Sequence, residues 1–314
     1  MLAFNATRKK NFEMSAPIPH VTVCICTYKR PALLQRLLED LAIQVTENLF
    51  TFSASVVDND RTESARPTVE AFAKAHAMPV LYSVQPIQNI SLTRNLAVKT
   101  AQSEYMAFID DDEFPIRDWL LILFKTLKAH EVDGVLGPVK PHFEAGTPEW
   151  VIKGKFYDRT SYPTGLVIDW PKGRTGNVLF KRAIFNGLEQ PFKKDFLTGE
   201  DQDFFRRMIE KGHKFIWCDE ALAYEVVPPI RWKRSFMMRR ALLRGKVSLR
   251  HPATGAKEIL KSAVAVPLYA LALPFSFLLG QHRFMDCLIR LCDHLGRLLA
   301  FLGIDPAQES YVTE

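Results

Sequence analysis

The sequence predicts an α/β fold in which a mostly parallel sheet is flanked by helices. From His20 onward, short apolar runs alternate with amphipathic stretches that have the period of a helix. Strand–helix alternation of this kind gives parallel strands with helices packed on the faces of the sheet. Ligands bind such sheets beyond the carboxyl ends of the strands. Functional residues are therefore expected just after residues 27, 58, 84 and 109.

The order of the predicted elements follows the apolar pattern. Predicted strands cover 20–27, 52–58, 78–84, 105–110 and 133–139, and predicted helices cover 31–44, 63–76, 91–101 and 116–130. Pro31 suits a first helical turn, and Ser91 is expected to cap its helix. The stretch 140–175, rich in Pro, Gly and aromatic residues, is predicted to be irregular. Beyond it we expect strands at 176–182, 214–218 and 221–227 and a helix at 200–212 that Gly212 closes.

Composition divides the chain into a loose tail at 1–18, an α/β domain at 19–227 and a C-terminal region at 228–314. With 47% hydrophobic and 24% charged residues, the chain has ample material for a core. The cysteines at 24, 26, 218, 287 and 292 form no CxxC pair, so neither a disulfide framework nor a zinc site is predicted. A reducing cytoplasm fits this usage. The N-terminal MLAFNATRKKNFEM lacks the apolar segment of a secretory signal.

The C-terminal region concentrates the positive charge of the chain, whose net value is +6. Between Pro228 and Lys261 there are ten Lys or Arg residues and one acid. The next stretch, 262–282, has no formal charge and is long enough to cross a bilayer, but basic residues on both sides argue against a single crossing. An amphipathic helix is predicted after it. This pattern favours an anionic membrane surface over nucleic acid, and the alternative is that both segments pack on the α/β domain.

An acidic cluster, Asp110-Asp111-Asp112-Glu113, directly follows the apolar strand residues 105–109. Hard divalent cations such as Mg²⁺ and Mn²⁺ prefer carboxylate oxygens and keep positions open for phosphates. A strand end holds such carboxylates in fixed positions. Taken alone, however, the cluster is weak evidence for a metal site, because a solvated turn is the usual explanation of such a motif.

Three further polar motifs lie at expected strand or helix ends. Asp58-Asn59-Asp60 offers a carboxylate to the uracil imide or forms an Asx turn. Thr27 to Pro31 carries a hydroxyl, a ring and cations that suit a nucleoside and its phosphate, or is ordinary loop polarity. Thr198 to Asp203 opens a helix, where acidic residues also complement the helix dipole. Each motif is ambiguous alone, but their common placement at element ends favours one functional site.

These motifs resemble those of the family 2 glycosyltransferases, which have the Rossmann-like GT-A fold. The resemblance covers about residues 20–250 and rests on VCICTYKRP, VVDND, ISLTRNLAV, AFIDDDE, TGNVLF and TGEDQDF. NISLTRN, FIDDDE and VLGPV are similar to bacterial exopolysaccharide glucosyltransferases of the succinoglycan type. The resemblance implies that 19–227 is the catalytic domain, and the charge and apolar pattern described above predicts that 228–314 associates with a membrane.

The resemblance also implies a role for each matching residue. The nucleotide-sugar site would contain Thr27, Tyr28, Arg30, Asp58, Arg94, Asp110, Asp111, Thr175, Gly176 and Asn177, with additional phosphate contacts from Arg240 and Arg244. Asp201 would be the catalytic base, and Glu200 would orient it or bind the acceptor. Asp112 and Asp110 would bind Mg²⁺ or Mn²⁺, with Asp112 preferred as the direct ligand. Many members have a metal-binding His in the region where this chain has Glu225, so either Glu225 substitutes as an oxygen ligand or this contact is absent.

The implied reaction is a single inverting displacement that moves a sugar, expected to be glucose, from UDP to a glycan acceptor. A polyprenyl-diphosphate-linked acceptor at the cytoplasmic face of the inner membrane would suit the C-terminal region. The segment from Arg240 to Gly245 lacks the Trp of processive synthases, which favours addition of one sugar. The alternatives are a metal-dependent nucleotidyltransferase or phosphohydrolase, and a non-catalytic membrane-associated nucleotide-sugar binding protein.

Overall fold

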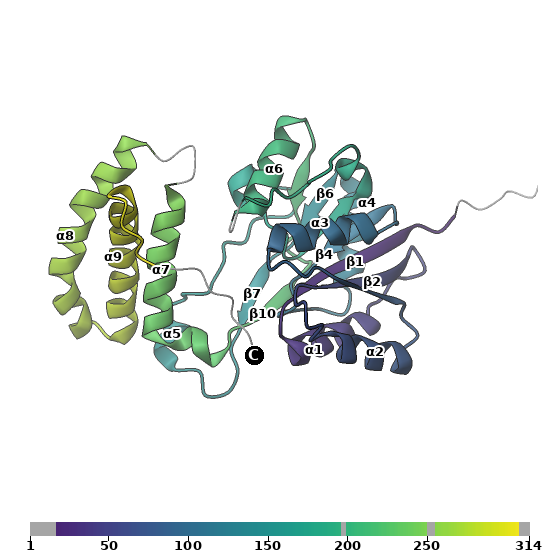
Figure 1. The fold of residues 1–314 in the computed structure, drawn as a ribbon, viewed down its shortest axis with the longest axis horizontal. Coiled ribbons are helices and arrows are strands. Elements are labelled where there is room, and N and C mark those ends of the chain that lie inside the picture. Colours follow the sequence, from purple (N-terminus) through teal and green to yellow (C-terminus); the bar gives the residue numbers. More distant parts are fainter. Residues whose placement is uncertain (1–16, 196–198, 250–254, 308–314) are drawn as a thin grey trace, which may run out of the picture.

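The computed structural model describes residues 17–195, 199–249 and 255–307, and it confirms the mostly parallel α/β fold (Figure 1). In these residues a seven-stranded sheet has the order β3-β2-β1-β4-β8-β6-β9. Its strands are β1 (His20–Thr27), β2 (Thr51–Asp58), β3 (Val80–Val84), β4 (Tyr105–Phe108), β6 (Gly134–Leu136), β8 (Val178–Lys181) and β9 (Phe215–Trp217). Only β8 pairs antiparallel with its described neighbours, β4 and β6.

Two apolar cores lie on opposite faces of this sheet, because alternate side chains of a strand point to opposite sides. Val21, Val23 and Ile25 of β1 belong to one core, and Cys24 belongs to the other. The first core is closed by α1 (Pro31–Ala42), α2 (Arg66–Ala75) and α4 (Trp119–His130). The second is closed by α3 (Ile90–Thr100) and α6 (Glu200–Glu210). The helices thus fix the carboxyl edge of the sheet from both sides.

Helix α3 begins one residue before its predicted start, and the expected cap was wrong. The side chain of Asn89 accepts a hydrogen bond from the Leu92 amide at 3.0 Å and caps the helix. Ser91 lies fully buried inside the first turn. Asn and Ser are comparable caps, so tertiary contacts decide between two such neighbours.

The predicted strand at 133–139 is two strands in two sheets. After β6 the chain turns at Gly137, where a Cβ atom would lie 2.2 Å from the Ala221 carbonyl oxygen, and Pro138 has no amide to donate. The chain then continues as β7 (Val139–His142), which forms a second sheet with β5 (Glu113–Pro115) and β10 (Ala223–Val226). Within 140–175 the structure adds α5 (Glu149–Lys153) and the 3-10 turn η1 (Trp170–Lys172), and the turn η2 (Arg182–Phe185) follows β8.

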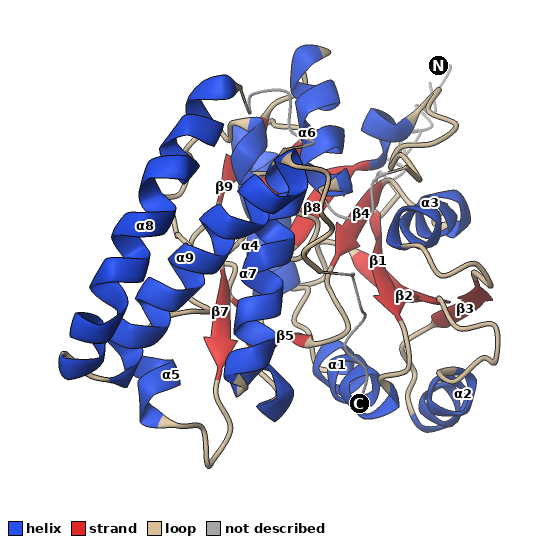
Figure 2. Cartoon of the chain, turned by 60° about the vertical axis from the view of Figure 1, so that its left-hand side comes forward, coloured by secondary structure: helices blue, strands red, loops and turns tan. Residues whose placement is uncertain are grey.

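The C-terminal helices stand to one side of the sheet (Figure 1), and the turn η3 (Pro229–Trp232) leads into them. We call them the helical unit: α7 (Arg234–Ser248), α8 (Ala256–Leu278) and α9 (Gln281–Phe301), which lie side by side in Figure 2. Helices α7 and α9 touch through their backbones. A Cβ atom on Gly245 would lie 2.0 Å from the Asp293 carbonyl oxygen, and one on Gly296 would lie 2.2 Å from that of Leu242.

Helix α8 places its apolar side chains on the outside of the molecule. Leu268, Leu271 and Phe275 are 61%, 71% and 70% exposed. Among the described residues, α8 is the one helix long and apolar enough to cross a membrane. The predicted tail at 1–18 and the end of the predicted C-terminal region fall largely on 1–16 and 308–314, outside the described residues.

Candidate active site

Most of the predicted site residues gather at the carboxyl edge of the sheet, and Arg244 is an exception described below. Thr27 ends β1 and pairs in register with Asp58, which ends β2. The loop that follows β4 carries the acidic cluster, and α6 begins with Glu200 and Asp201. Parallel strands bring their carboxyl ends to one edge, so residues far apart in sequence meet there.

The loop after β1 is tied to the acidic cluster through Asp111. The Thr27 hydroxyl donates to Asp111 at 2.9 Å, and the Arg30 guanidinium donates to the other oxygen of that carboxylate at 2.7 Å. Arg30 also lies 3.2 Å from Asp112. Burial raises the pKa of Asp111, and Arg30 opposes that rise. Tyr28, which is half-buried, lies in the same loop, and the Lys29 ammonium is 5.3 Å from the centre of its ring.

Asp58 is fully buried and its carboxylate is already bonded inside the protein. It accepts hydrogen bonds from the Asp60 amide at 2.9 Å, the Ala65 amide at 2.8 Å and the Tyr82 hydroxyl at 2.9 Å. The geometry therefore gives Asp58 the task of shaping the loop after β2.

At the start of α6, one carboxylate is paired and its neighbour is not. The Arg94 guanidinium donates to Glu200 and lies 3.6 Å from Asp110, so it connects α6 to the acidic cluster. The Asp201 carboxylate accepts only a local bond from the Gln202 amide, at 2.8 Å, among the described contacts. Burial raises the pKa of Asp201, and Arg94 opposes that rise. Asp201 is the available carboxylate here.

Asp203 is the other carboxylate near Asp201 in sequence that could be considered as the base, but its side chain is already bonded to arginines. Its two oxygens accept from Arg206 at 2.9 Å and from Arg207 at 2.8 Å, and the residue is buried. Both oxygens of Asp203 are therefore occupied by arginines, which leaves this carboxylate less available to an acceptor hydroxyl than that of Asp201.

A second group of charges, which we call the β5–β10 cluster, contains Asp112, Glu113, Glu225, Arg159 and Arg231. Strand pairing sets Glu225 opposite Glu113. Arg231 donates to Asp112 at 3.0 Å and to Glu225, and Arg159 donates to the other oxygen of Glu225. Burial raises the pKa of Asp112 to about 7, helped by Glu225. Burial works to raise the pKa of Glu225 too, but Arg159 and Arg231 hold it below its usual value.

Sequence reasoning missed Arg159 and Arg231. Arg159 lies in the stretch predicted to be irregular, and Arg231 lies in the basic segment assigned to a membrane surface. The one available signal was an arginine placed six residues after Glu225, next to the end of a strand.

Thr175, Gly176 and Asn177 lie in three different environments, and only Gly176 is shown to lie next to the acidic side chains. A Cβ atom on Gly176 would lie 2.8 Å from Glu113 and 3.1 Å from Asp110, so Gly176 faces the acidic side chains. The buried Thr175 hydroxyl has no hydrogen-bond partner among the described residues. The Asn177 amide is instead used structurally: it donates to the Pro138 and Ala221 carbonyls and accepts from the Trp119 indole at 2.7 Å.

The two arginines of α7 that were predicted to contact phosphate, Arg240 and Arg244, also lie in different environments. Arg240 interacts electrostatically with Arg231, Glu225 and Tyr157 and thus stands beside the β5–β10 cluster. Arg244 donates to Asp293 of α9 at 2.9 Å, and its side chain is 60% exposed. The structure brings Arg240, but not Arg244, to the candidate site.

The carboxylates of the site have the right chemistry for Mg²⁺ or Mn²⁺, since hard cations take oxygen ligands. Their arrangement is not that of a formed cage, because Arg231 stands between Asp112 and Glu225. Within 17–195, 199–249 and 255–307, no three or more His, Cys, Asp or Glu side chains converge on one point. Asp110 is the most accessible ligand, with a side chain 41% exposed.

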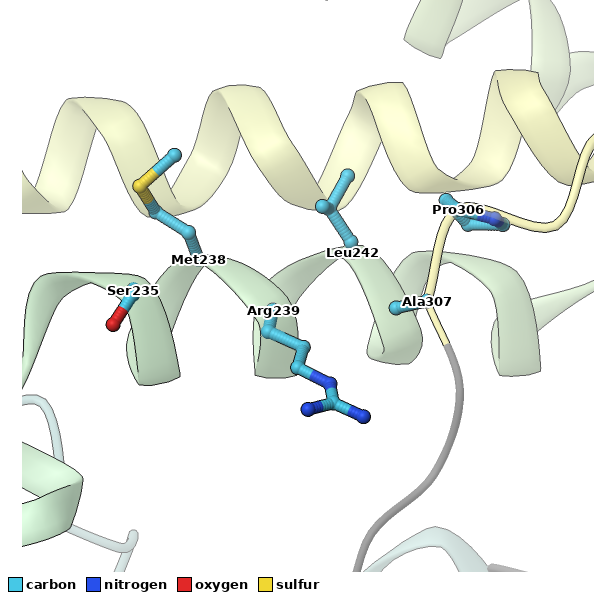
Figure 3. Close-up of a pocket in the computed structure, with 6 residues that line it drawn as sticks. All are labelled: Ser235, Met238, Arg239, Leu242, Pro306 and Ala307. Carbon is cyan, nitrogen blue, oxygen red and sulfur yellow. The ribbon is translucent and has the colours of Figure 1, made fainter.

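A separate groove of about 470 Å³ lies on the helical unit, away from these charges. It is lined by residues of α7 and of the segment after α9 (Figure 3), namely Ser235, Met238, Arg239, Leu242, Pro306 and Ala307. None of these belongs to the β5–β10 cluster or to the start of α6.

Comparison with known proteins agrees with this arrangement. The family model "Glycosyl transferase family 2" matches residues 22–187. The succinoglycan biosynthesis protein ExoM of Rhizobium meliloti is 32% identical over 256 residues, which are 78% of this chain and 80% of that protein. The putative glycosyltransferase EpsH of Bacillus subtilis is 25% identical over 194 residues, covering 59% of this chain and 54% of that protein.

Solved glycosyltransferases share the fold. The mannosyltransferase PcManGT from Pyrobaculum calidifontis, in complex with GDP-Man and Mn²⁺, has a TM-score of 0.62 at 17% identity, covering 91% of this chain and 88% of that one. S. aureus TarS 1–349 in complex with UDP has a TM-score of 0.51 at 16% identity, covering 90% and 91%. Fold, site and family match converge: this chain belongs to glycosyltransferase family 2 and has the GT-A fold.

Proposed function

We propose that the protein is an inverting hexosyltransferase that moves glucose from UDP-glucose to a lipid-linked glycan in bacterial exopolysaccharide synthesis. The observation that carries this proposal is the unpaired Asp201 carboxylate at the start of α6, beside the Arg94–Glu200 pair and the acidic cluster. The similarity to a protein named for succinoglycan biosynthesis supports the pathway class.

In the proposed reaction, Asp201 accepts the proton of the acceptor hydroxyl. The hydroxyl oxygen forms a bond to the anomeric carbon while the bond from that carbon to the β-phosphate oxygen breaks, so UDP leaves from the opposite face. One displacement inverts the anomeric configuration. Arg94 is the group that joins the two halves of this site, since it contacts Glu200 on the acceptor side and Asp110 on the donor side.

The donor is proposed to bind along the loops after β1 and β2. Tyr28 would contact the nucleoside, and Arg30 would offer its guanidinium to the diphosphate, since arginine forms paired hydrogen bonds to phosphate oxygens. Thr27 and Asp58 would support the donor site indirectly. The Thr27 hydroxyl is bonded to Asp111, and the Asp58 carboxylate is bonded to backbone amides of the loop after β2. Gly176 and Thr175 would border the sugar. The UDP bound by S. aureus TarS supports a nucleotide donor.

Asp110, Asp112 and Glu225 are the proposed ligands of Mg²⁺ or Mn²⁺. When bound, such an ion supplies positive charge that stabilises the negative charge growing on a departing diphosphate. The Mn²⁺ in the PcManGT complex supports this choice of cofactor.

The helical unit is proposed to dock the enzyme on the cytoplasmic face of the inner membrane, with α8 lying in the membrane plane. Arg297 of α9 donates to the buried Ser262 of α8 at 2.9 Å, and Tyr269 of α8 stacks on His294 of α9. Helix α9 carries charged residues along its length and cannot follow α8 into the hydrocarbon. Exposed Lys257, Lys261 and Arg283 flank the apolar face and suit anionic headgroups.

The test of the proposed function compares Asp201→Asn with Asp203→Asn in single-turnover transfer from radiolabelled UDP-glucose to a polyprenyl-diphosphate-linked glycan. We expect Asp201→Asn to lower the transfer rate by about 10²–10⁴-fold, the usual contribution of a general base, while UDP-glucose affinity stays near that of the unaltered protein. Asp203→Asn should lower the rate far less, because Asp203 is bonded to Arg206 and Arg207.

The products separate the alternatives. A glycosyltransferase yields UDP and an extended glycan. A phosphohydrolase that cleaves the phosphoanhydride of UDP-glucose yields UMP and glucose 1-phosphate, and a nucleotidyltransferase moves the uridylyl group to an acceptor phosphate and also releases glucose 1-phosphate. Near-normal transfer by Asp201→Asn would contradict the assigned base. Donor binding without any transfer, across a panel of UDP-sugars and acceptors, would instead favour the non-catalytic binding protein.

A further inference from the structure

The guanidinium of Arg231 stands between two carboxylates proposed as metal ligands. One terminal nitrogen donates to Asp112 at 3.0 Å and the other donates to Glu225. All three side chains are about nine-tenths buried, with exposures of 10%, 10% and 13% for Arg231, Asp112 and Glu225. A planar guanidinium with two donor nitrogens can hold two carboxylates at once, which an ammonium group does less well.

The two carboxylates have other partners on their outer sides. Arg30 lies 3.2 Å from Asp112, and Arg159 donates to the second oxygen of Glu225. Removal of Arg231 would therefore leave each carboxylate with one remaining arginine. Among the described residues, Arg231 is the cation that both carboxylates share.

We propose that Arg231 is an internal counter-cation in the place of the divalent ion, so that Mg²⁺ or Mn²⁺ reaches Asp112 and Glu225 only when Arg231 moves away. Two buried carboxylates close together need a positive charge between them, and the guanidinium supplies it in the donor-free protein. Binding of the ion and binding of the Arg231 side chain to this pair are mutually exclusive.

The Arg231 guanidinium also has an unused donor that a phosphate group could bind. Its Nε atom is buried and has no hydrogen-bond partner among the described residues. The donor diphosphate brings phosphate oxygens, which accept paired hydrogen bonds from a guanidinium. Arg231 can then pass from the carboxylates to the diphosphate while the ion takes its place, so donor and ion would bind together more tightly than either binds alone.

The test measures Mn²⁺ binding to the full-length protein by the loss of the free-ion electron paramagnetic resonance signal, without donor and then with UDP. We expect the unaltered protein to bind Mn²⁺ weakly without UDP. Arg231→Gln should bind it at least about tenfold more tightly, as a competing ion pair has been removed. Arg290→Gln is the matched control, because Arg290 also pairs with a carboxylate, Asp286, but lies on α9; it should leave Mn²⁺ affinity unchanged.

A second variant, Arg231→Lys, keeps the inference testable if Arg231→Gln does not fold. Arg231→Lys keeps the charge but cannot bridge both carboxylates, and it should bind Mn²⁺ more tightly than the unaltered protein and less tightly than Arg231→Gln. UDP should raise Mn²⁺ affinity strongly in the unaltered protein and only slightly in Arg231→Gln. Equal or weaker Mn²⁺ binding by both variants, without UDP, would overturn the inference.

The inference rests on the proposed metal ligands, and the same titration distinguishes the two. Suppose that the unaltered protein binds Mn²⁺ in the presence of UDP, but that all three proteins have the same Mn²⁺ affinity in the absence of UDP. Then only the role of Arg231 is wrong. If no protein binds Mn²⁺ even with UDP, the metal assignment itself is wrong, and the inference falls with it.

Discussion

Helices α4 and α8 are both apolar, yet they place their apolar side chains in opposite surroundings. Six of the twelve residues of α4 are buried, and its Trp119, Leu123 and Leu127 pack in the core against the sheet. Only Ser262, a polar residue, is buried in the 23 residues of α8. Apolar surface facing water costs free energy in proportion to its area, so the exposed side of α8 suits the lipid docking proposed above, whereas α4 already packs on the sheet.

The largest expected effect tests α8 directly. Changing Leu268, Leu271 and Phe275 together to Ser should lower affinity for anionic lipid vesicles by more than about 100-fold, because burial of each such side chain contributes about 1.5–3 kcal/mol. Co-sedimentation with vesicles measures this. The altered side chains are exposed, so the thermal unfolding midpoint in solution should hardly change.

The matched change in α4 should show the reverse. Leu123→Ala should lower the free energy of unfolding by about 2–5 kcal/mol and leave the vesicle affinity of the folded protein unchanged. The proposed difference between α4 and α8 is wrong if the α8 triple variant keeps normal vesicle affinity. It is also wrong if that variant loses as much free energy of unfolding as Leu123→Ala does.

A smaller effect is expected from the contact inside the helical unit. Gly296→Val should destabilise that unit by about 1–3 kcal/mol, because its new side chain meets the backbone of α7. Hydrogen exchange in 234–301 should accelerate while exchange in β1 and β2 stays slow. Gly255→Ala is the control, since nothing lies within 4 Å of an added Cβ atom there. Equal exchange in both variants would show that the close backbone contact is unimportant.

The smallest effect concerns pH and separates the two regions once more. Burial raises the pKa of Asp201, and only the ionised carboxylate accepts a proton, so transfer should be lost on acidification at a higher pH than an ordinary aspartate would give. Vesicle binding should persist there, since Lys and Arg stay charged. A single-turnover rate profile from neutral to acidic pH tests this, and a flat profile would argue against Asp201 as the base.

The sequence predicted the elements that local patterns determine. Strand ends and a helix start were sufficient to bring Thr27, Asp58, Asp110 and Asp201 to one edge, because parallel topology places such ends together. Composition predicted the uncharged stretch at 262–282 but left open whether it packs on the α/β domain, and the structure shows its apolar side chains exposed on α8.

What the sequence did not predict depends on contacts between distant residues. Arg231 lies 119 positions from Asp112, and no local pattern reports that the two are bonded. The same holds for Asn177, whose amide is used by three partners from other segments, and for Gly137, which turns one predicted strand into two. Residue type indicated chemistry at these positions, but tertiary packing decided whether the side chain was available for it.

The backbone contact at Gly245 and Gly296 has a consequence for acceptor choice. Because the two helices touch through their main chains, α7 cannot slide along α9, and η3 connects α7 to the catalytic sheet. On an enzyme docked as proposed above, the helical unit would then serve as a spacer of constant thickness between the lipid surface and the catalytic domain. The enzyme would measure a glycan from its lipid end, accepting a terminal sugar at one height above the bilayer and passing over chains one unit shorter or longer.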